Sequence, residues 1–225
     1  MKNLSNVDIH EFLSRCRGDR VEGRTVLHEN KSYAMPYSTV KIQNKIIKGL
    51  RENEERIELI ESIINKNSSS RSSYLDVGSN LGVFVRSFDH IFEEVYGVDA
   101  DWYYVEQCRY LYPDLESSFT LGDLNVTRLT DIFSSSKDVV TALSMIEYID
   151  DKQAFVGDLF SLTNELCIVE GHSESIECGA DAVYDSLLRT QNWEVKKLPI
   201  TTDAGYNAPE ATKNIGRPLW VCKKQ

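Results

Sequence analysis

The sequence contains no long apolar run and no regular cysteine pattern. No stretch approaches the roughly 18 uncharged apolar residues that a membrane-spanning helix needs, and residues 1–20 lack the apolar segment of a signal peptide. The five cysteines are scattered and include no CxxC pair. We therefore expect a cytoplasmic protein with reduced thiols, without disulfides and without a cysteine-bound metal.

Positive charge is also scarce. Lys and Arg number 25 against 35 Asp and Glu, so the formal net charge is −10. Such a surface repels phosphate backbones, which disfavours nucleic acid as the partner. The hydrophobic fraction of 41% is ordinary for a globular chain, and 225 residues suffice for one sizeable α/β domain with an additional arm. The oligomeric state stays open.

A serine-rich stretch, NSSSRSS, divides the chain into an N-terminal arm (residues 1–72) and a body (residues 73–225). In the arm, apolar residues recur at helical spacing between residues 40 and 66, which predicts a long amphipathic helix. A shorter helix is expected over residues 7–16. We therefore expect the arm to be helical.

The body alternates between strand-like and helical segments. The expected strands cover residues 73–77, 94–98, 118–121, 139–143, 166–170, 193–199 and 219–223. The expected helices cover residues 83–91, 102–112, 152–162 and 180–191. This alternation predicts a doubly wound, mostly parallel α/β sheet, with the last two strands paired antiparallel at one edge.

A glycine turn, Gly78-Ser79-Asn80-Leu81-Gly82, follows the first expected strand of the body. A P-loop is excluded because Val83 stands where its second glycine belongs and no lysine follows. A dinucleotide fingerprint, GxGxxG, would need glycines at positions 80 and 83, where the chain has Asn80 and Val83. Asn80 tolerates the left-handed conformation that such a turn requires.

Three acidic residues accompany this turn. Asp76 precedes it inside an apolar strand, where an unpaired carboxylate would cost several kcal/mol. S-adenosylmethionine would explain it, because its methionine end carries an ammonium group. Asp99 ends the second strand, where a carboxylate can accept both ribose hydroxyls, and Asp123 follows the third, within reach of an adenine amine. Taken singly, Asp99 or Asp123 could instead be a helix N-cap.

Four segments, LDVGSNLGVF, YGVDAD, LGDL and VVTALSMIEYIDD, resemble in order and spacing the motifs of class I S-adenosylmethionine-dependent methyltransferases. The first departs from the commonest GxGxG form at Asn80. The resemblance implies a Rossmann-like sheet of seven strands, S-adenosyl-L-methionine as cofactor, and a methyltransferase activity. The residues expected to bind the cofactor are Asp76, Gly78, Ser79, Asn80, Gly82, Asp99, Ala100, Asp123, Leu124, Ser144 and Met145.

The acceptor should lie near the ends of the fourth and fifth strands. There we expect Glu147, Tyr148, Glu170 and His172 to act in catalysis, with His172 as the base that a hydroxyl acceptor needs. His172 could equally be an exposed loop histidine. No metal site is expected. The ending GRPLWVC is loosely similar to that of bacterial methyltransferases acting on surface polysaccharides or other sugars, although for Arg217 itself a surface ion pair is expected.

The acceptor is therefore expected to be a small molecule or a sugar hydroxyl. By analogy with related methyltransferases, the arm is expected to cover the cofactor, with aromatic and polar contacts from Lys31, Tyr33, Met35, Pro36, Tyr37 and Gln43. Two alternatives stay open: a nucleotide- or NAD-binding Rossmann enzyme, and a catalytically inactive S-adenosylmethionine-binding regulatory module.

Overall fold

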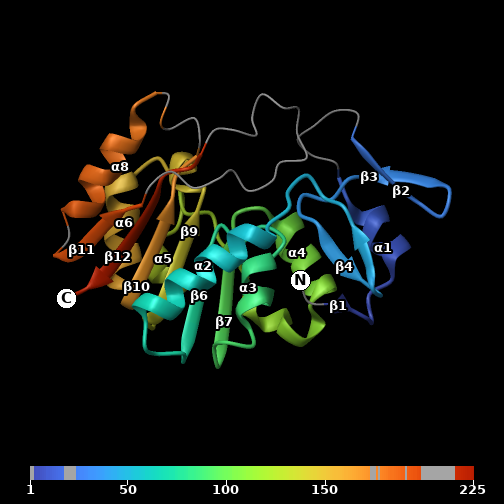
Figure 1. Ribbon diagram of the computed structural model, residues 1–225, viewed down its shortest axis with the longest axis horizontal. Helices are drawn as coiled ribbons and strands as arrows, with labels where there is room; N and C mark the ends of the chain where they lie inside the picture. Colours follow the sequence, from blue (N-terminus) through green and yellow to red (C-terminus); the bar gives the residue numbers. More distant parts are fainter. Residues whose placement is uncertain (1–2, 18–23, 173–175, 177, 191, 199–215) are drawn as a thin grey trace.

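A seven-stranded sheet forms the centre of the body in the computed structural model, which describes residues 3–17, 24–172, 176, 178–190, 192–198 and 216–225. Its strands are β6 (Ser73–Val77), β7 (Glu94–Asp99), β8 (Phe119–Leu121), β9 (Lys137–Leu143), β10 (Thr163–Glu170), β11 (Trp193–Lys197) and β12 (Leu219–Lys224). They follow the order β11-β12-β10-β9-β6-β7-β8 (Figure 1). Only β12 runs antiparallel to its neighbours, β10 and β11. The predicted fold class is confirmed.

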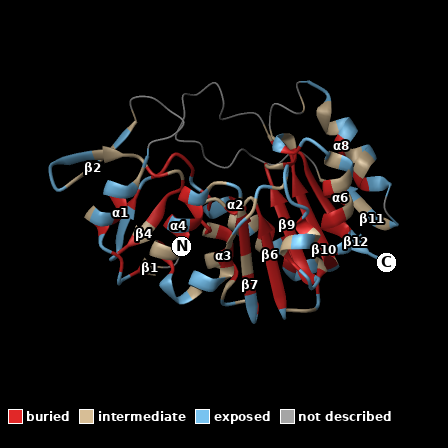
Figure 2. Cartoon of the chain, turned by 180° about the vertical axis from the view of Figure 1, so that it is seen from behind, coloured by how far each residue is buried: buried red, intermediate tan, exposed pale blue. Residues whose placement is uncertain are grey.

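Helices lie on both faces of this sheet. The body and the end of the arm contain α2 (Glu54–Asn67), α3 (Val83–Phe88), α4 (Trp102–Leu111), α5 (Leu129–Ile132), α6 (Lys152–Ser161), α8 (Ala180–Arg189) and the 3₁₀ helices η1 (Pro113–Ser118) and η2 (Ile146–Tyr148). Alternate residues of the central strands enter two separate apolar cores. In β6, Tyr74 belongs to the core that contains residues of α2, α3 and α4, whereas Leu75 and Val77 belong to the core that contains residues of α6 and α8. Figure 2 shows the central strands β6 and β9 as buried.

The arm is not purely helical, so this part of the prediction was wrong. It contains β1 (Asn3–Leu4), α1 (Ile9–Arg15), β2 (Thr25–His28), β3 (Lys31–Ala34), β4 (Val40–Ile42) and β5 (Lys45–Ile47). Residues 40–47, expected to begin a long helix, form the β4–β5 hairpin instead. Gln43 and Asn44 make its turn at positive φ (49° and 64°), and the β-branched residues on either side favour strands. The helix begins only at Glu54.

Residues 199–215, a polar stretch of the sequence between the last two strands, lie outside the described residues. Among the described residues, no helix is long and apolar enough to cross a lipid bilayer.

The order of the strands locates the ligand crevice. From β6 the chain passes to β7 and β8 on one side, and then returns to β9 on the other. In open α/β sheets, ligands bind outside the carboxyl ends of the strands where the order reverses. The carboxyl ends of β6 and β9, which follow Val77 and Leu143, therefore mark the expected site.

Two glycines of contrasting surroundings test this packing. Gly82 has a φ of +63°, and a Cβ there would lie 2.6 Å from Cε1 of the buried Phe119 ring. We expect Gly82→Ala to lower the free energy of unfolding by about 1–3 kcal/mol, from overpacking and a left-handed backbone. Gly157 lies within α6, and a Cβ there would meet nothing within 4 Å. Gly157→Ala should raise stability by about 0.5–1 kcal/mol.

Urea denaturation followed by circular dichroism measures both changes. Equal effects of the two substitutions would contradict the packing described around the glycine turn.

Candidate cofactor and active site

A cavity of about 300 Å³ opens at the carboxyl ends of β6, β7 and β9. Nine residues expected at the site line it: Asp76, Gly78, Ser79, Asn80, Asp99, Ala100, Ser144, Met145 and Tyr148. A larger cavity, of about 540 Å³, lies between the arm, α2 and α3, and contains none of the motif acids. The smaller cavity is therefore the candidate site.

The glycine turn bends the backbone at the carboxyl end of β6, where it lines the cavity. Gly78 and Asn80 have φ angles of 78° and 48°, so Asn80 adopts the left-handed conformation expected of it. The N–H groups of Gly78 and Ser79 both donate to the carbonyl of Val98, at 2.8 and 3.0 Å. A Cβ on Gly78 would come within 3.1 Å of Cβ of Met145, so a larger residue would narrow the cavity.

Asp99 organises the same turn from the end of β7. Its carboxylate accepts from the backbone N–H of Asn80 at 2.8 Å and of Asp101 at 2.9 Å. The N-cap of α4 is Asp101, whose side chain accepts from Tyr103 N–H. Asp99 is therefore not the helix cap that was considered for it. It joins the turn to the cavity wall, where a ribose would be bound.

Asp76 is buried in β6, with 2% of its surface exposed. The Thr141 hydroxyl donates to it at 2.7 Å and lies 2.6 Å from the Tyr74 hydroxyl. Burial raises the pKa of Asp76 to about 7. A cation entering the cavity would favour the ionised carboxylate, as the ammonium group of an amino acid would do.

Two arginines that the sequence analysis did not identify also line the cavity. Arg51 precedes α2 and Arg56 lies in its first turns. Arg56 is buried on the same face of α2 as Ile60 and Ile64. An arginine on the apolar face of a helix is unusual, and this was the feature of the sequence that could have identified it. Asp76 supplies a negative charge that suits the ammonium group of an amino-acid zwitterion. The two guanidinium groups would hold the carboxylate at the methionine end of the cofactor.

Glu170, at the end of β10, is enclosed by positive charge. Arg56 binds both of its oxygens, Nε at 2.9 Å and Nη2 at 2.7 Å, and Arg217 lies 3.3 Å away. Arg217 is only 1% exposed, so the expected surface ion pair is in fact buried. The arginines lower the pKa of Glu170 against the opposing effect of burial. A carboxylate held in this way is a poor proton acceptor, and the geometry disfavours Glu170 as the base.

Ser144 connects this network to β9. Its hydroxyl donates to Glu170 at 2.6 Å and accepts from Arg56 and Arg217. The backbone of Ser144 has a φ of 58°, which is unusual for a residue other than glycine. Such strain persists only where neighbours hold the residue in place, and it recurs at functional sites.

The structure brings Glu147 and His172 together. Glu147, in η2, accepts from the backbone N–H of His172 at 2.5 Å, which joins the segments after β9 and β10. Burial raises the pKa of Glu147. Tyr148, next to Glu147, is 60% exposed and lines the cavity.

Six of the expected residues do not line the cavity: Gly82, Asp123, Leu124, Glu147, Glu170 and His172. Asp123 accepts from Asn125 N–H in a turn, and Leu124 lines a separate cavity with Arg128. Their link to an adenine stays a prediction.

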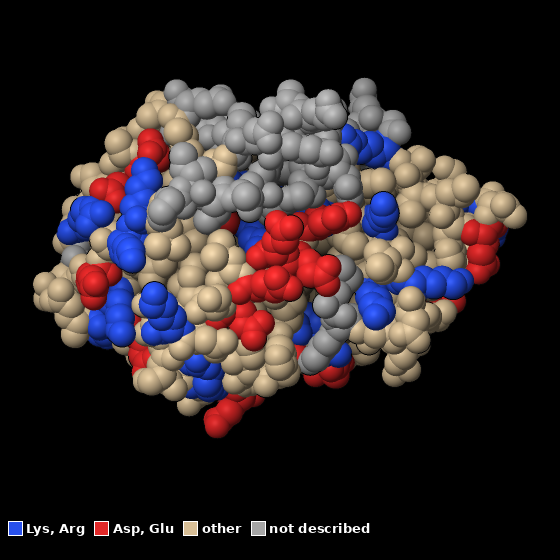
Figure 3. All heavy atoms as spheres, viewed as in Figure 1, with Lys and Arg blue, Asp and Glu red and all other residues tan. Residues whose placement is uncertain are grey.

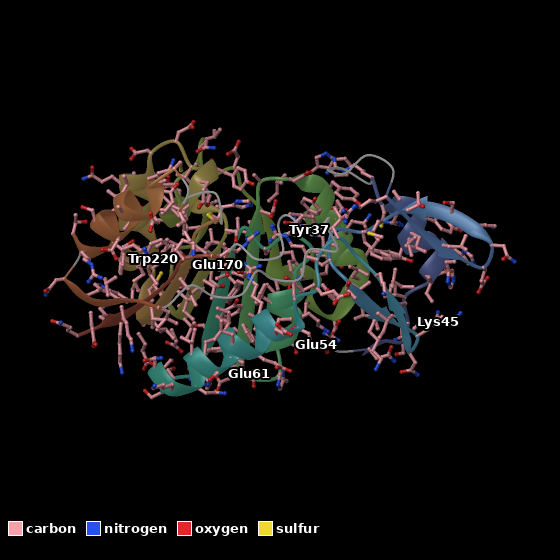
Figure 4. The ribbon with its side chains drawn as sticks, turned by 45° about the horizontal axis from the view of Figure 1, so that its top comes forward. Tyr37, Lys45, Glu54, Glu61, Glu170 and Trp220 are labelled. Atoms are coloured by element: carbon pink, nitrogen blue, oxygen red, sulfur yellow. The ribbon has the colours of Figure 1, made fainter. Side chains whose placement is uncertain are left out.

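Of the expected arm contacts, Tyr37 reaches the cavity, with its ring 5.9 Å from that of Tyr104. Tyr33 and Gln43 instead bind within the arm, to His10 and to the carbonyl of Val7. Figure 4 shows Tyr37 and Glu170 near the middle of the molecule, from the arm and the sheet respectively.

Residues 75–164 match a family model described as a methyltransferase domain. Among solved structures, the chain resembles an S-adenosylmethionine-dependent methyltransferase from Clostridium acetobutylicum, with 11% identity, a TM-score of 0.59, and 76% of this chain and 92% of that chain covered. It also resembles magnesium protoporphyrin IX methyltransferase from Synechocystis with bound SAH, with 12% identity, a TM-score of 0.56, and coverage of 77% and 84%.

A third similar structure is the methyltransferase domain of bacterial CtHen1-CN, with 17% identity, a TM-score of 0.57, and coverage of 76% and 99%. A search among curated proteins found no match to this sequence. At these identities the structures establish the fold, while the family match covers the part of the cavity that the sheet supplies and not the part that the arm supplies.

Asp76→Asn tests the buried carboxyl. Its pKa of about 7 lies above the ordinary value of 3.8 for an aspartate, so its neutral form stabilises the fold at low pH and this contribution is lost as pH rises through 7. The amide stays neutral. We expect the variant to gain about 2–4 kcal/mol relative to the wild type between pH 5 and pH 8.

Affinity for S-adenosylhomocysteine should show the complementary change. In the wild type it should weaken as pH falls below about 7, since the ammonium group needs the ionised carboxylate. In Asp76→Asn it should be weaker and independent of pH over this range. Calorimetry at several pH values measures this, and parallel profiles of the two proteins would refute the assignment.

Asp99→Ala tests the ribose contact. Affinity for S-adenosylhomocysteine should fall by about 1.5–3 kcal/mol for each charged hydrogen bond lost. Asp123→Ala is the matched control, because Asp123 also follows a strand but lies outside the cavity lining. Circular dichroism checks that both variants fold. Equal losses of affinity in the two variants would indicate that Asp123 also binds the cofactor. No loss in Asp99→Ala would indicate that Asp99 only orders the glycine turn.

Proposed function

We propose that the chain is a class I S-adenosylmethionine-dependent methyltransferase, as its match to a methyltransferase domain and its fold support, and that it methylates a hydroxyl group of a small molecule or a sugar. The observation that carries the proposal is the contact between Glu147 and His172, at the ends of the two strands beside the cofactor cavity. The contact holds the backbone of His172 beside Glu147, and the proposal takes the imidazole of His172 as the base.

Methyl transfer is an in-line displacement, so the protein mainly positions two atoms. When bound, S-adenosylmethionine supplies the methyl group as an electrophile and leaves as a neutral thioether. A hydroxyl acceptor is a weak nucleophile and must lose its proton as the new bond to carbon forms. The imidazole of His172 would take that proton. Glu147 would hold the backbone of His172, acting as a positioning residue.

The charge of the surface near the site favours an acceptor that is not a nucleic acid. Acidic side chains gather over α2 near the middle of one face, where Glu54, Glu55 and Glu58 are exposed (Figure 3). This surface disfavours nucleic acid, whereas carboxylates accept hydrogen bonds from sugar hydroxyls.

The proposal is tested with methyl-labelled cofactor and a protein-free extract of small molecules. The label should enter a small product as a methyl ether, which survives mild base, and S-adenosylhomocysteine should form in equal amount. Label that mild base removes would indicate a carboxylate acceptor and overturn the proposal. Binding of S-adenosylhomocysteine without transfer to any extract or hydroxyl compound would favour an inactive binding module.

His172→Ala should lower turnover by about a hundredfold or more, the usual scale for a general base. Cofactor affinity should barely change, because His172 does not line the cofactor cavity. The pH profile of turnover should also lose the limb that belongs to the imidazole, which normally titrates near 6.5.

His90→Ala is the matched control, since His90 is an exposed histidine that follows α3. Wild-type turnover in His172→Ala across this pH range would exclude His172 as the base and direct attention to Tyr148.

A further inference from the structure

A second cluster of chemically active side chains lies in the arm. His10 of α1 and His28 and Glu29 of the β2–β3 hairpin bring ring nitrogens and a carboxylate within 4.8 Å of one another. Nε2 of His10 is 2.7 Å from one oxygen of Glu29, and Nε2 of His28 is 3.5 Å from the other. The side chain of His28 is 10% exposed, although it belongs to a surface hairpin.

The two distances that involve Glu29 are close to those of a transition-metal site, and all three ligand atoms lie within 4.8 Å of one another. Zinc binds imidazole nitrogen and carboxylate oxygen at about 2.0–2.2 Å in a tetrahedron, which places its ligands about 3.3 Å apart. The separation of 3.5 Å between His28 and Glu29 already matches this value, and the contact of 2.7 Å between His10 and Glu29 needs a small widening. Three protein ligands would leave a fourth position for water.

The surroundings of His10 match a ligand already oriented for a metal. Its other ring nitrogen, Nδ1, lies 2.6 Å from the hydroxyl of Tyr33. Metal-binding histidines almost always direct their second nitrogen to such a partner, which sets the tautomer and the ring orientation. Nε2 is then the nitrogen that points to Glu29 and is available to an ion. Lys45, 3.7 Å from Glu29 and largely exposed, can turn away to solvent.

The hairpin packs on the core through Val26 and Tyr33, but its strands pair only with each other among the described strands. Strands β2 and β3 form a two-stranded sheet of their own, joined to neither of the other described sheets. It projects at the end of the molecule opposite β11 (Figure 1), and Figure 4 labels Lys45 at that same end. An isolated two-stranded hairpin is marginally stable in water. A metal ion bound by residues of both α1 and the hairpin would add a further connection between them.

We infer that His10, His28 and Glu29 form a binding site for a divalent transition metal, best suited to Zn²⁺, that fastens the β2–β3 hairpin to α1. The site is separate from the cofactor cavity, and the sequence did not predict it. His10 and Glu29 are 19 residues apart, a separation that belongs to no metal-binding motif.

The fastened segment continues toward the cofactor. Arg17, two residues after α1, forms an ion pair with Asp101 at 2.5 Å and lies 3.7 Å from the centre of the Tyr103 ring. Asp101 lines the cofactor cavity. By fixing α1, the ion would therefore also order Arg17 and its contacts with the start of α4.

The test uses the untagged chain of 225 residues, stripped with a chelator and titrated with Zn²⁺ alone. Elemental analysis after dialysis should give one zinc ion per chain, and Zn²⁺ should raise the melting temperature through preferential binding to the folded state. Co²⁺ in place of Zn²⁺ should give the intense visible bands of a four-coordinate ion. His28→Ala and Glu29→Gln should each weaken Zn²⁺ binding about a hundredfold or more, and Tyr33→Phe about tenfold.

His90→Ala is the matched control and should bind Zn²⁺ as the wild type does, because His90 is distant in sequence and exposed. Affinity for S-adenosylhomocysteine, measured in Zn²⁺-free buffer, checks that each variant is folded. Less than one equivalent of zinc in the wild type, or unchanged binding in both His28→Ala and Glu29→Gln, would overturn the inference.

Discussion

The buried carboxylate of Glu170 is the contact on which the site depends. It binds Arg56 of the arm helix α2 and Arg217 of the segment before β12, and it accepts a hydrogen bond from the hydroxyl of Ser144 at the end of β9. Three segments distant in sequence thus meet at the carboxyl end of β10. Removing one partner of a buried ion pair typically costs about 3–5 kcal/mol, because the other charge is left without compensation. The network therefore holds the arm and both strands in one arrangement.

The same network sets the electrostatics of the cavity. Arg56 belongs to both, since it binds Glu170 and lines the cavity together with Arg51. Its positive charge partly offsets the rise that burial causes in the pKa of Asp76. A carboxyl that is readily ionised by an incoming cation then stands close to fixed guanidinium groups. This arrangement explains how one small cavity can accept both charges of an amino-acid end.

The arm contributes residues to the candidate site. Tyr37 lines the cavity, Arg56 anchors the arm on the sheet, and Arg17 binds Asp101 at the start of α4. These contacts lie at successive points along the chain, so the arm follows the edge of the site instead of folding as a separate unit. The inferred metal site would stabilise the β2–β3 hairpin, whose two strands pair with no other described strand.

The sequence by itself determined the fold class and predicted nine of the residues that line the candidate cavity. Hydrophobic periodicity and the glycine turn depend on local spacing, so the strands, Asp76 and Asp99 could all be placed from it. It failed for residues 40–47, where a β-branched hairpin resembles the start of an amphipathic helix. Only the tertiary structure decided the roles of Arg56, Arg217 and the His10 cluster. Their partners are distant in the chain, and burial, not spacing, turns an ordinary charged residue into part of a site.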